Sequence, residues 1–245
     1  MTMSLRASIA TPGGKAPYVR RLFATIADRY DLITVLLSYG QDRRWKRRLL
    51  EIAGPLEGRR LIDLACGTGD IAFAAAARGA VVTGLDLTPR MIHLAREKAG
   101  TGGAFGSVRF LVGDMMTLPF ASGSCDVVTT GYGLRNVPAL APAVQEIGRV
   151  LKPGGLFVSL DFNRPRSAIV RAAYHAYLSA VGSTVGFALH GDPDTYRYIA
   201  ESIRTYPGAD AIVELLGRHG FKNATWRPVL GGLLAIHVAR RSEVA

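Results

Sequence analysis

Short apolar runs alternate along the chain with longer segments in which apolar residues recur three or four positions apart. The runs predict strands at residues 59–65, 80–86, 108–112, 125–131, 155–161, 221–228 and 233–239. The periodic segments predict helices at residues 69–78, 89–99, 138–150, 166–188, 193–204 and 208–218, and Lys152–Gly155 predicts a turn. Strands that alternate with helices are typical of an α/β fold. We therefore expect a seven-stranded, mostly parallel sheet that ends in an antiparallel hairpin.

The chain before the first strand divides into two parts. Residues 1–16 carry no periodic apolar pattern, and we expect them to be disordered. Residues 17–54 predict two amphipathic helices, the second with Asp42 as its N-cap. These helices are expected to cover the ligand-binding edge of the sheet, and a purely structural role is the alternative. With a helical insertion at residues 166–218, they complete a single domain spanning residues 17–245.

The stretch from Leu61 to Asp70 combines a buried strand, a glycine turn and the start of a helix. Gly67 and Gly69 suit a sharp turn at which a ligand approaches the backbone, although such turns often serve packing alone. The third glycine of a pyrophosphate-binding fingerprint is absent. Asp63 places a carboxylate beside the turn, which would repel phosphate and attract a cation. The pattern favours a positively charged, phosphate-free, nucleoside-like ligand.

Two further predicted strands also end in carboxylates. Asp86 closes the second strand, 23 residues after Asp63, where an acid commonly accepts the hydroxyl groups of a ribose. Asp114 closes the third strand and is placed to accept an adenine amino group. Because ligands of parallel sheets lie at the carboxyl ends of strands, three such acids indicate one shared site.

Four motifs resemble those of class I S-adenosylmethionine-dependent methyltransferases, which have a Rossmann-like fold. They are Asp-Leu-Ala-Cys-Gly-Thr-Gly-Asp (63–70), Leu-Asp-Leu-Thr-Pro-Arg-Met (85–91), Gly-Asp-Met-Met-Thr-Leu-Pro-Phe (113–120) and Arg-Val-Leu-Lys-Pro-Gly-Gly (149–155). The resemblance implies S-adenosylmethionine as cofactor. It implies that Gly67, Thr68 and Gly69 surround the methionine part, that Asp86 binds the ribose, that Asp114 and Met115 bind the adenine, and that Gly131 faces the sulfonium.

The composition is that of an ordinary globular protein, with 49% hydrophobic residues, but its formal net charge is +11. Cys66 and Cys125 fit a reducing cytoplasm without disulfides, and five scattered histidines predict no metal site. Neither a signal peptide nor a membrane span is expected.

The basic charge is densest between Arg43 and Arg48. A solvated helix face is the simplest explanation of this run. Because Trp45, Leu49 and Leu50 interleave with the charges, peripheral contact with an anionic membrane surface is the alternative. The chain lacks the Asn/Asp-Pro-Pro-aromatic motif common in enzymes that methylate DNA amino groups, so we expect no nucleic-acid partner.

Motifs outside the cofactor half resemble the ubiquinone/menaquinone biosynthesis C-methyltransferase family. They are Tyr-Asp-Leu (30–32), Ser-Tyr-Gly-Gln-Asp-Arg-Arg-Trp-Lys (38–46), Gly-Leu-Arg-Asn-Val (133–137), Tyr-Arg-Tyr-Ile-Ala-Glu-Ser-Ile-Arg (196–204) and Gly-Gly-Leu-Leu-Ala-Ile-His (231–237). The resemblance implies C-methylation of a prenylated quinol. Demethylmenaquinol is the preferred substrate, and a benzoquinol of the ubiquinone pathway or a non-catalytic cofactor-binding protein are the alternatives.

Such chemistry needs a phenolate, and a fixed cation can lower the pKa of a phenol by about 1–3 units. Arg135 is the candidate cation, with pairing to a sheet-end carboxylate such as Asp161 as its alternative role. Asn136, Tyr30 and Tyr196 are candidates for binding the ring oxygens. Apolar residues of the insertion predict either a groove for the prenyl tail or a homodimer interface.

Overall fold

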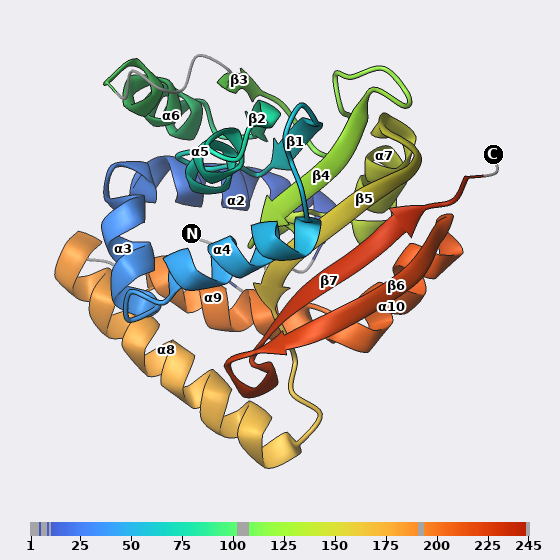
Figure 1. Cartoon of the computed structure of the whole chain (residues 1–245). Coiled ribbons are helices and arrows are strands. Elements are labelled where there is room, and N and C mark those ends of the chain that lie inside the picture. Colours follow the sequence, from blue (N-terminus) through green and yellow to red (C-terminus); the bar gives the residue numbers. More distant parts are fainter. Residues whose placement is uncertain (1–4, 6–8, 10, 102–107, 191–193, 244–245) are drawn as a thin grey trace.

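The computed structural model describes residues 5, 9, 11–101, 108–190 and 194–243 (Figure 1). Its strands are β1 (Arg60–Leu64), β2 (Val81–Asp86), β3 (Val108–Val112), β4 (Cys125–Gly131), β5 (Leu151–Phe162), β6 (Phe221–Val229) and β7 (Leu234–Arg241). Its helices are α2 (Pro12–Ile26), α3 (Tyr30–Leu37), α4 (Asp42–Ala53), α5 (Asp70–Ala76), α6 (Pro89–Thr101), α7 (Leu140–Val150), α8 (Ala168–His190), α9 (Asp194–Thr205) and α10 (Ala209–Arg218). The short 3₁₀ helices are η1 (Ala27–Arg29), η2 (Leu134–Asn136) and η3 (Leu230–Gly232).

The seven strands form one sheet in the order β3-β2-β1-β4-β5-β7-β6. The first five pair in parallel, whereas β7 runs antiparallel to both β5 and β6. The predicted mixed sheet with a final antiparallel hairpin is confirmed. The order reverses between β1 and β4, where open α/β sheets bind their ligands.

Helices cover both faces of the sheet, and side chains alternate between two cores. In β5, Leu156, Val158 and Leu160 face a core shared with α4, α5 and α6, whereas Phe157 faces one shared with α7 and α10. A third cluster joins α2 and α3 to α9 through Val19, Leu22, Ile26, Ile33 and Tyr198. The N-terminal helices thus pack on the insertion at the ligand-binding edge (Figure 1).

The N-terminal boundary differs from the prediction. Helix α2 begins at Pro12, so residues 12–16 belong to the folded chain. Thr11 caps the helix by accepting a hydrogen bond from the Gly14 amide, and proline suits a first helical turn because it has no N–H to satisfy. The prediction for the residues before Thr11 lies largely outside the described part of the chain.

The turn predicted at Lys152–Gly155 is absorbed into β5. Cys125 pairs with Leu151 and Val127 with Leu156, so β5 carries extra residues that bulge away from β4. Gly154 adopts a φ of +73° within this bulge. Proline and glycine therefore produce an irregularity within the strand here, and the strand does not end.

Candidate functional site

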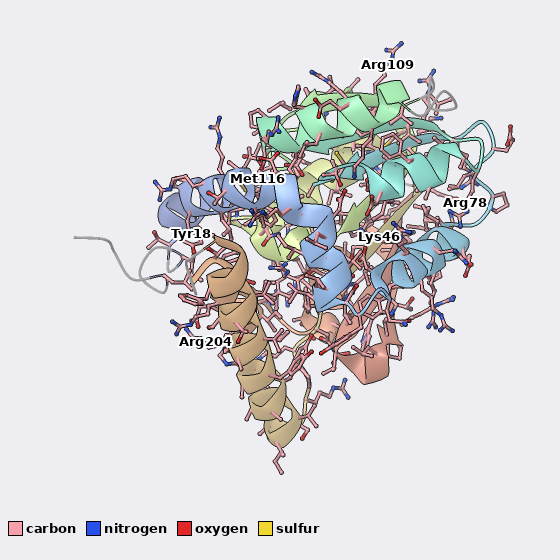
Figure 2. The ribbon with its side chains drawn as sticks, turned by 90° about the vertical axis from the view of Figure 1, so that its left-hand side faces the viewer. Tyr18, Lys46, Arg78, Arg109, Met116 and Arg204 are labelled. Carbon is pink, nitrogen blue, oxygen red and sulfur yellow. The ribbon has the colours of Figure 1, made fainter. Side chains whose placement is uncertain are left out.

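A cavity of about 340 Å³ lies at the carboxyl ends of β1, β2 and β4. Its walls come from the sheet edge, from α2, α3 and α4, and from α8, α9 and η3. Figure 2 views the molecule from the side on which α2, α3 and α8 lie, and these helices stand in front of the sheet. The predicted cover is thus part of the cavity wall.

One end of the cavity is built on the glycine turn after β1. Gly67 has a φ of +55°, and its amide donates a hydrogen bond of 2.9 Å to Asp86 Oδ2. Asp86 Oδ1 accepts a second bond, of 2.8 Å, from the Thr88 amide. Burial raises the pKa of Asp86, and these hydrogen bonds oppose the shift. Because a carboxylate has about four lone-pair sites, Asp86 can still accept ribose hydroxyl groups.

Three more predicted residues line the same end of the cavity: Asp114, Met115 and Gly131. Asp114 Oδ1 accepts a hydrogen bond of 2.8 Å from the Met116 amide, which orients the carboxylate after β3. A Cβ atom at Gly131 would lie 2.7 Å from Ile71 Cδ1. A side chain at the end of β4 would therefore require the Ile71 side chain of α5 to move.

Thr68 and Gly69, in contrast, do not line this cavity. The Thr68 hydroxyl donates a 2.6 Å hydrogen bond to Asp31 of α3, so it fastens the cover to the glycine turn. A Cβ atom at Gly69 would meet Phe73 Cε2 at 2.8 Å, which shows that this glycine serves packing. Both residues thus have structural roles, and their predicted contact with the methionine part stays a prediction.

Asp63 also lies behind the turn and outside the cavity wall. It is fully buried; Oδ1 accepts a 2.8 Å hydrogen bond from the Thr129 hydroxyl, and Oδ2 has no partner in the described part of the chain. Burial raises the pKa of Asp63 to about 7. The predicted binding of a ligand by Asp63 stays a prediction, and a buried carboxylate favours a cation nearby.

The sequence profile of the ubiE/COQ5 methyltransferase family matches residues 12–241. The chain belongs to this family. A demethylmenaquinone methyltransferase from Thermus thermophilus is 39% identical over 222 residues, which cover 90% of this chain and 100% of that protein. The ubiquinone/menaquinone biosynthesis C-methyltransferase UbiE from Azotobacter vinelandii is 36% identical over 226 residues, covering 91% and 89%.

The fold agrees with this assignment. A solved S-adenosylmethionine-dependent methyltransferase from Aquifex aeolicus superposes with a TM-score of 0.58 and 16% identity, over 80% of this chain and 88% of that one. The ubiE/COQ5 member described here has the Rossmann-like class I methyltransferase fold, and S-adenosylmethionine is its methyl donor. Asp86 and Asp114 place two acidic side chains at this end of the cavity, next to a glycine turn that lacks the pyrophosphate fingerprint. These features suit S-adenosylmethionine, a nucleoside with positive charge and no phosphate. The residues placed to hold it are Gly67, Asp86, Asp114, Met115 and Gly131.

Arg135 forms the predicted pair with Asp161, and its role toward a phenolate stays a prediction. It lines the cavity, and its Nε lies 3.3 Å from Asp161 Oδ1. Its Nη1 donates a 2.8 Å hydrogen bond to the Ser202 hydroxyl, and its Cζ lies 5.0 Å from the centre of the Phe162 ring. The guanidinium is held rigidly, but part of its charge is neutralised by Asp161.

The other predicted substrate-binding residues differ in how far their polar atoms are already hydrogen-bonded within the protein. Asn136 lines the cavity, but its Oδ1 accepts bonds from Arg135 and from the Tyr198 hydroxyl, and its Nδ2 donates to Tyr132 O. Tyr30 also lines the cavity, with its Cε1 3.6 Å from a Cβ built at Gly67. Tyr196 lies in α9, and its side chain is outside the described part of the chain.

Sequence reasoning missed three charged or polar residues at the site: Lys15, Asp42 and Tyr132. Lys15 Nζ donates a 2.8 Å hydrogen bond to the carbonyl of Arg135, and burial lowers its pKa to about 8. Asp42 accepts a bond from Tyr132 Oη instead of capping α4, whose N-cap is Gln41. The spacing of these residues along the chain carried no signal of these contacts.

The basic run on α4 is exposed at Arg43, Arg44, Arg47 and Arg48. Of the apolar residues on which the membrane interpretation relied, Leu49 and Leu50 are fully buried in the core, whereas Trp45 is half-buried and lines the cavity. Within the described residues no helix is long and apolar enough to cross a membrane, and no cluster of potential metal ligands occurs.

Exposed apolar side chains gather elsewhere, at the cavity mouth. Tyr39, Tyr177 and Leu230 line the cavity while remaining 75%, 41% and 55% exposed. Tyr39 and Tyr177 share a hydrogen bond of 2.6 Å between their hydroxyl groups, which links the end of α3 to α8. Exposed residues continue outward from this rim along both helices: Leu32, Val35, Leu36, Ile169 and Val170.

Proposed function

We propose that this methyltransferase methylates a ring carbon of a prenylated demethylmenaquinol and releases the corresponding menaquinol. The observation that carries the proposal is the continuity of the cavity. It joins the acidic cofactor end at Gly67 and Asp86 to an apolar region that opens between Tyr39, Tyr177 and Leu230. A ring held in the middle would have the methyl donor on one side and an exit for its tail on the other.

The apolar region suits a prenyl tail. Val19, Leu22 and Ile26 of α2 and Ile33 of α3 line it, together with Leu178 of α8. Each buried CH₂ group contributes about 0.8 kcal/mol, so even one or two isoprene units add appreciably to binding. A small polar acceptor would leave this surface unused.

S-adenosylmethionine supplies an electrophilic methyl group, so the acceptor carbon must be made nucleophilic. Ionising a phenol with a pKa of about 10 costs roughly 4 kcal/mol at pH 7. Arg135 and Lys15 together carry two positive charges against the single negative charge of Asp161. This net positive charge, at the end of β5, supports a phenolate oxygen placed beside Arg135, and Tyr30 can bond the second ring oxygen.

A benzoquinol of ubiquinone biosynthesis is the second candidate, because the Azotobacter relative is named for both pathways. The test is methyl transfer from labelled S-adenosylmethionine to short-tailed demethylmenaquinol or benzoquinol analogues in oxygen-free buffer. We expect label in the naphthoquinol. Label only in the benzoquinol would overturn the preferred substrate, and label in neither, with cofactor still bound, would favour a non-catalytic binding protein.

We also propose that the rim of exposed apolar residues, with the arginines of α4, rests on an anionic membrane surface at the inner face of the cell membrane. A prenylated quinol resides in the bilayer, and its tail would leave the cavity between Tyr39 and Tyr177. Aromatic and aliphatic residues flanked by arginines are typical of such interfacial contact. The alternative occupant of the rim is a second copy of the chain, and the oligomeric state in detergent-free buffer distinguishes the two.

A further inference from the structure

Tyr132 and Asp42 meet at the cavity from elements far apart in the sequence. Tyr132 directly follows β4 and has a φ of +60°, in the left-handed region that tyrosine rarely adopts. Its hydroxyl donates a 3.0 Å hydrogen bond to Asp42 Oδ1, at the start of α4, and both residues line the cavity. Backbone strain of this kind is maintained only where the surrounding structure imposes it, and it often marks a functional position.

Asp42 belongs to a cluster of charged side chains around Lys46. Its Oδ2 lies 2.6 Å from Lys46 Nζ, and the same ammonium lies 2.8 Å from Asp70 Oδ2. Two carboxylates therefore share one cation, and Asp42 is only 3% exposed. Burial acts to lower the pKa of Lys46, but Asp70 and Asp42 outweigh it and raise the pKa, so Lys46 stays charged. Lys46 thus holds one oxygen of Asp42, while the other, Oδ1, accepts the hydrogen bond from Tyr132.

Positive charge lies at another part of the wall, where Arg135 lines the cavity and has Lys15 and Asp161 as neighbours. The Phe162 ring lies close to both groups, with its centre 5.6 Å from that of Tyr132 and 5.0 Å from Arg135 Cζ. An aromatic ring bound here would have a proton acceptor near one edge and a cation near another. This separation suits removal of a hydroxyl proton with stabilisation of the phenolate that remains.

Other lining groups are less suited to accept that proton. Both oxygens of Asp86 accept backbone hydrogen bonds that hold the glycine turn, and Asp114 lies at the cofactor end after β3. Asp161 lies behind Arg135, with which it is paired, and does not itself line the cavity. No histidine is among the described residues that line the cavity. Asp42 is the remaining carboxylate at the acceptor end.

We infer that Asp42, acting through the Tyr132 hydroxyl, accepts the proton of the quinol ring hydroxyl. The inference rests on the proposed function. The quinol O–H bond breaks as Tyr132 Oη takes the proton, while the original Tyr132 proton passes to Asp42 Oδ1. After methylation, the hydrogen on the ring carbon leaves to water as aromaticity returns. The Asp42 proton then returns through Tyr132 to the ring oxygen, so one proton is released overall.

The electrostatics of the pair agree with a relay. Burial, reinforced by Asp42, raises the pKa of Tyr132 well above its usual value, so the phenol stays protonated and donates to Asp42. Tyr30 from α3 also faces the cluster, and burial raises its pKa as well. The groups facing Asp42 from α3, α4, α5 and the end of β4 are therefore Tyr30, Lys46, Asp70 and Tyr132.

The test is the pH profile of methyl transfer for the wild type, Asp42→Asn and Tyr132→Phe. Between about pH 6 and 7.5, below the pKa of Lys15, we expect a nearly flat wild-type rate when S-adenosylmethionine is saturating, because the bound cation keeps Asp63 ionised. Asp42→Asn should be on the order of 10²-fold slower at pH 7, and its rate should rise about tenfold per pH unit because solvent must ionise the quinol. Tyr132→Phe should show the same slope, and it decides the question if Asp42→Asn does not fold.

Asp28→Asn is the matched control, because it removes a carboxylate from the N-terminal cover that pairs with Arg90, away from Lys46 and outside the cavity wall. It should keep the flat wild-type profile. A purely structural role of the Asp42–Tyr132 contact predicts lower stability or a higher KM with the profile unchanged, and that result would overturn the inference. A wild type that methylates neither quinol would contradict the proposed function instead, so the two failures are distinguishable.

Discussion

Arg135 and Asp161 form a buried ion pair at the wall of the cavity, with 3.3 Å between Nε and Oδ1. The Arg135 amide also donates to Asp161 Oδ2 at 3.1 Å, so side chain and backbone both hold the carboxylate. Their exposed fractions are 5% and 1%. The residue predicted to stabilise a phenolate is thus also the partner of a carboxylate that water does not reach.

Arg135→Ala should therefore affect folding as well as turnover. Removing one partner of a buried ion pair commonly costs about 3–5 kcal/mol, because the other charge is left uncompensated. We expect a loss of this size in the free energy of unfolding, measured by urea denaturation. The affinity for S-adenosylhomocysteine, measured by calorimetry on the folded fraction, should be nearly unchanged.

The double variant Arg135→Ala/Asp161→Asn separates the two effects. Neutralising Asp161 should restore most of the stability, while turnover should remain low because the cation is still missing. Recovery of turnover along with stability would show that Arg135 acts only as the partner of Asp161.

The protonation of Asp63 should change when the positively charged cofactor binds. Its pKa of about 7 leaves the carboxyl near half-protonated at pH 7, and a nearby cation lowers the pKa of a carboxyl group. Binding of S-adenosylmethionine at pH 7 should therefore release up to about half a proton. Calorimetry in phosphate and in Tris, whose ionisation enthalpies differ, measures that release, and Asp63→Asn should abolish it. Identical heats for the wild type in both buffers would mean that Asp63 does not sense the ligand.

His237 makes the fold sensitive to acid. It is 1% exposed, lies 3.3 Å from the Ala209 carbonyl through Nε2, and burial lowers its pKa to about 4. Between pH 6.5 and 4 the unfolded chain binds a proton that the folded chain excludes, so stability falls as the pH falls. The shift corresponds to a loss of about 3 kcal/mol. The stability difference between the wild type and His237→Gln should change by this amount between pH 7.5 and 4, and a constant difference would contradict the assignment.

The strands and their acidic ends could be predicted because each depends on local pattern. The predicted bounds of β3 and β4 agree with the structure to the residue, and Asp86 and Asp114 both reach the cavity. The contacts of Tyr132 with Asp42 and of Lys15 with Arg135 join residues 90 and 120 positions apart. They depend on how the N-terminal helices pack, which no local pattern encodes.

The basic run shows a different kind of error. Lys46, Leu49, Leu50 and Ala53 recur at helical spacing and form the buried side of α4. This spacing places Lys46 on the buried side, whereas its charge alone would place it on the exposed side with the neighbouring arginines. A lysine whose ammonium is neutralised by Asp42 and Asp70 can lie on the buried side of an amphipathic helix.

Membrane contact through α4 and the cavity rim predicts two separable losses of vesicle binding. Replacing the four exposed arginines of α4 by Gln should weaken binding to anionic vesicles on the order of 10²-fold or more, because each charge near such a surface contributes about 1 kcal/mol. The variant changes Arg43, Arg44, Arg47 and Arg48. Leu32→Ser/Leu36→Ser should instead reduce the binding that persists at high salt, because it removes apolar contact from α3.

The matched control removes the same number of exposed arginines from other surfaces. It replaces Arg60, Arg109, Arg218 and Arg240 by Gln. Arg109, on β3, lies at the opposite end of the molecule from α8 (Figure 2). If net charge alone attracted the protein to the vesicles, both quadruple variants would lose binding equally in a sedimentation assay. An oriented contact predicts that the control retains most of its binding, because the arginines it loses do not face the lipid surface.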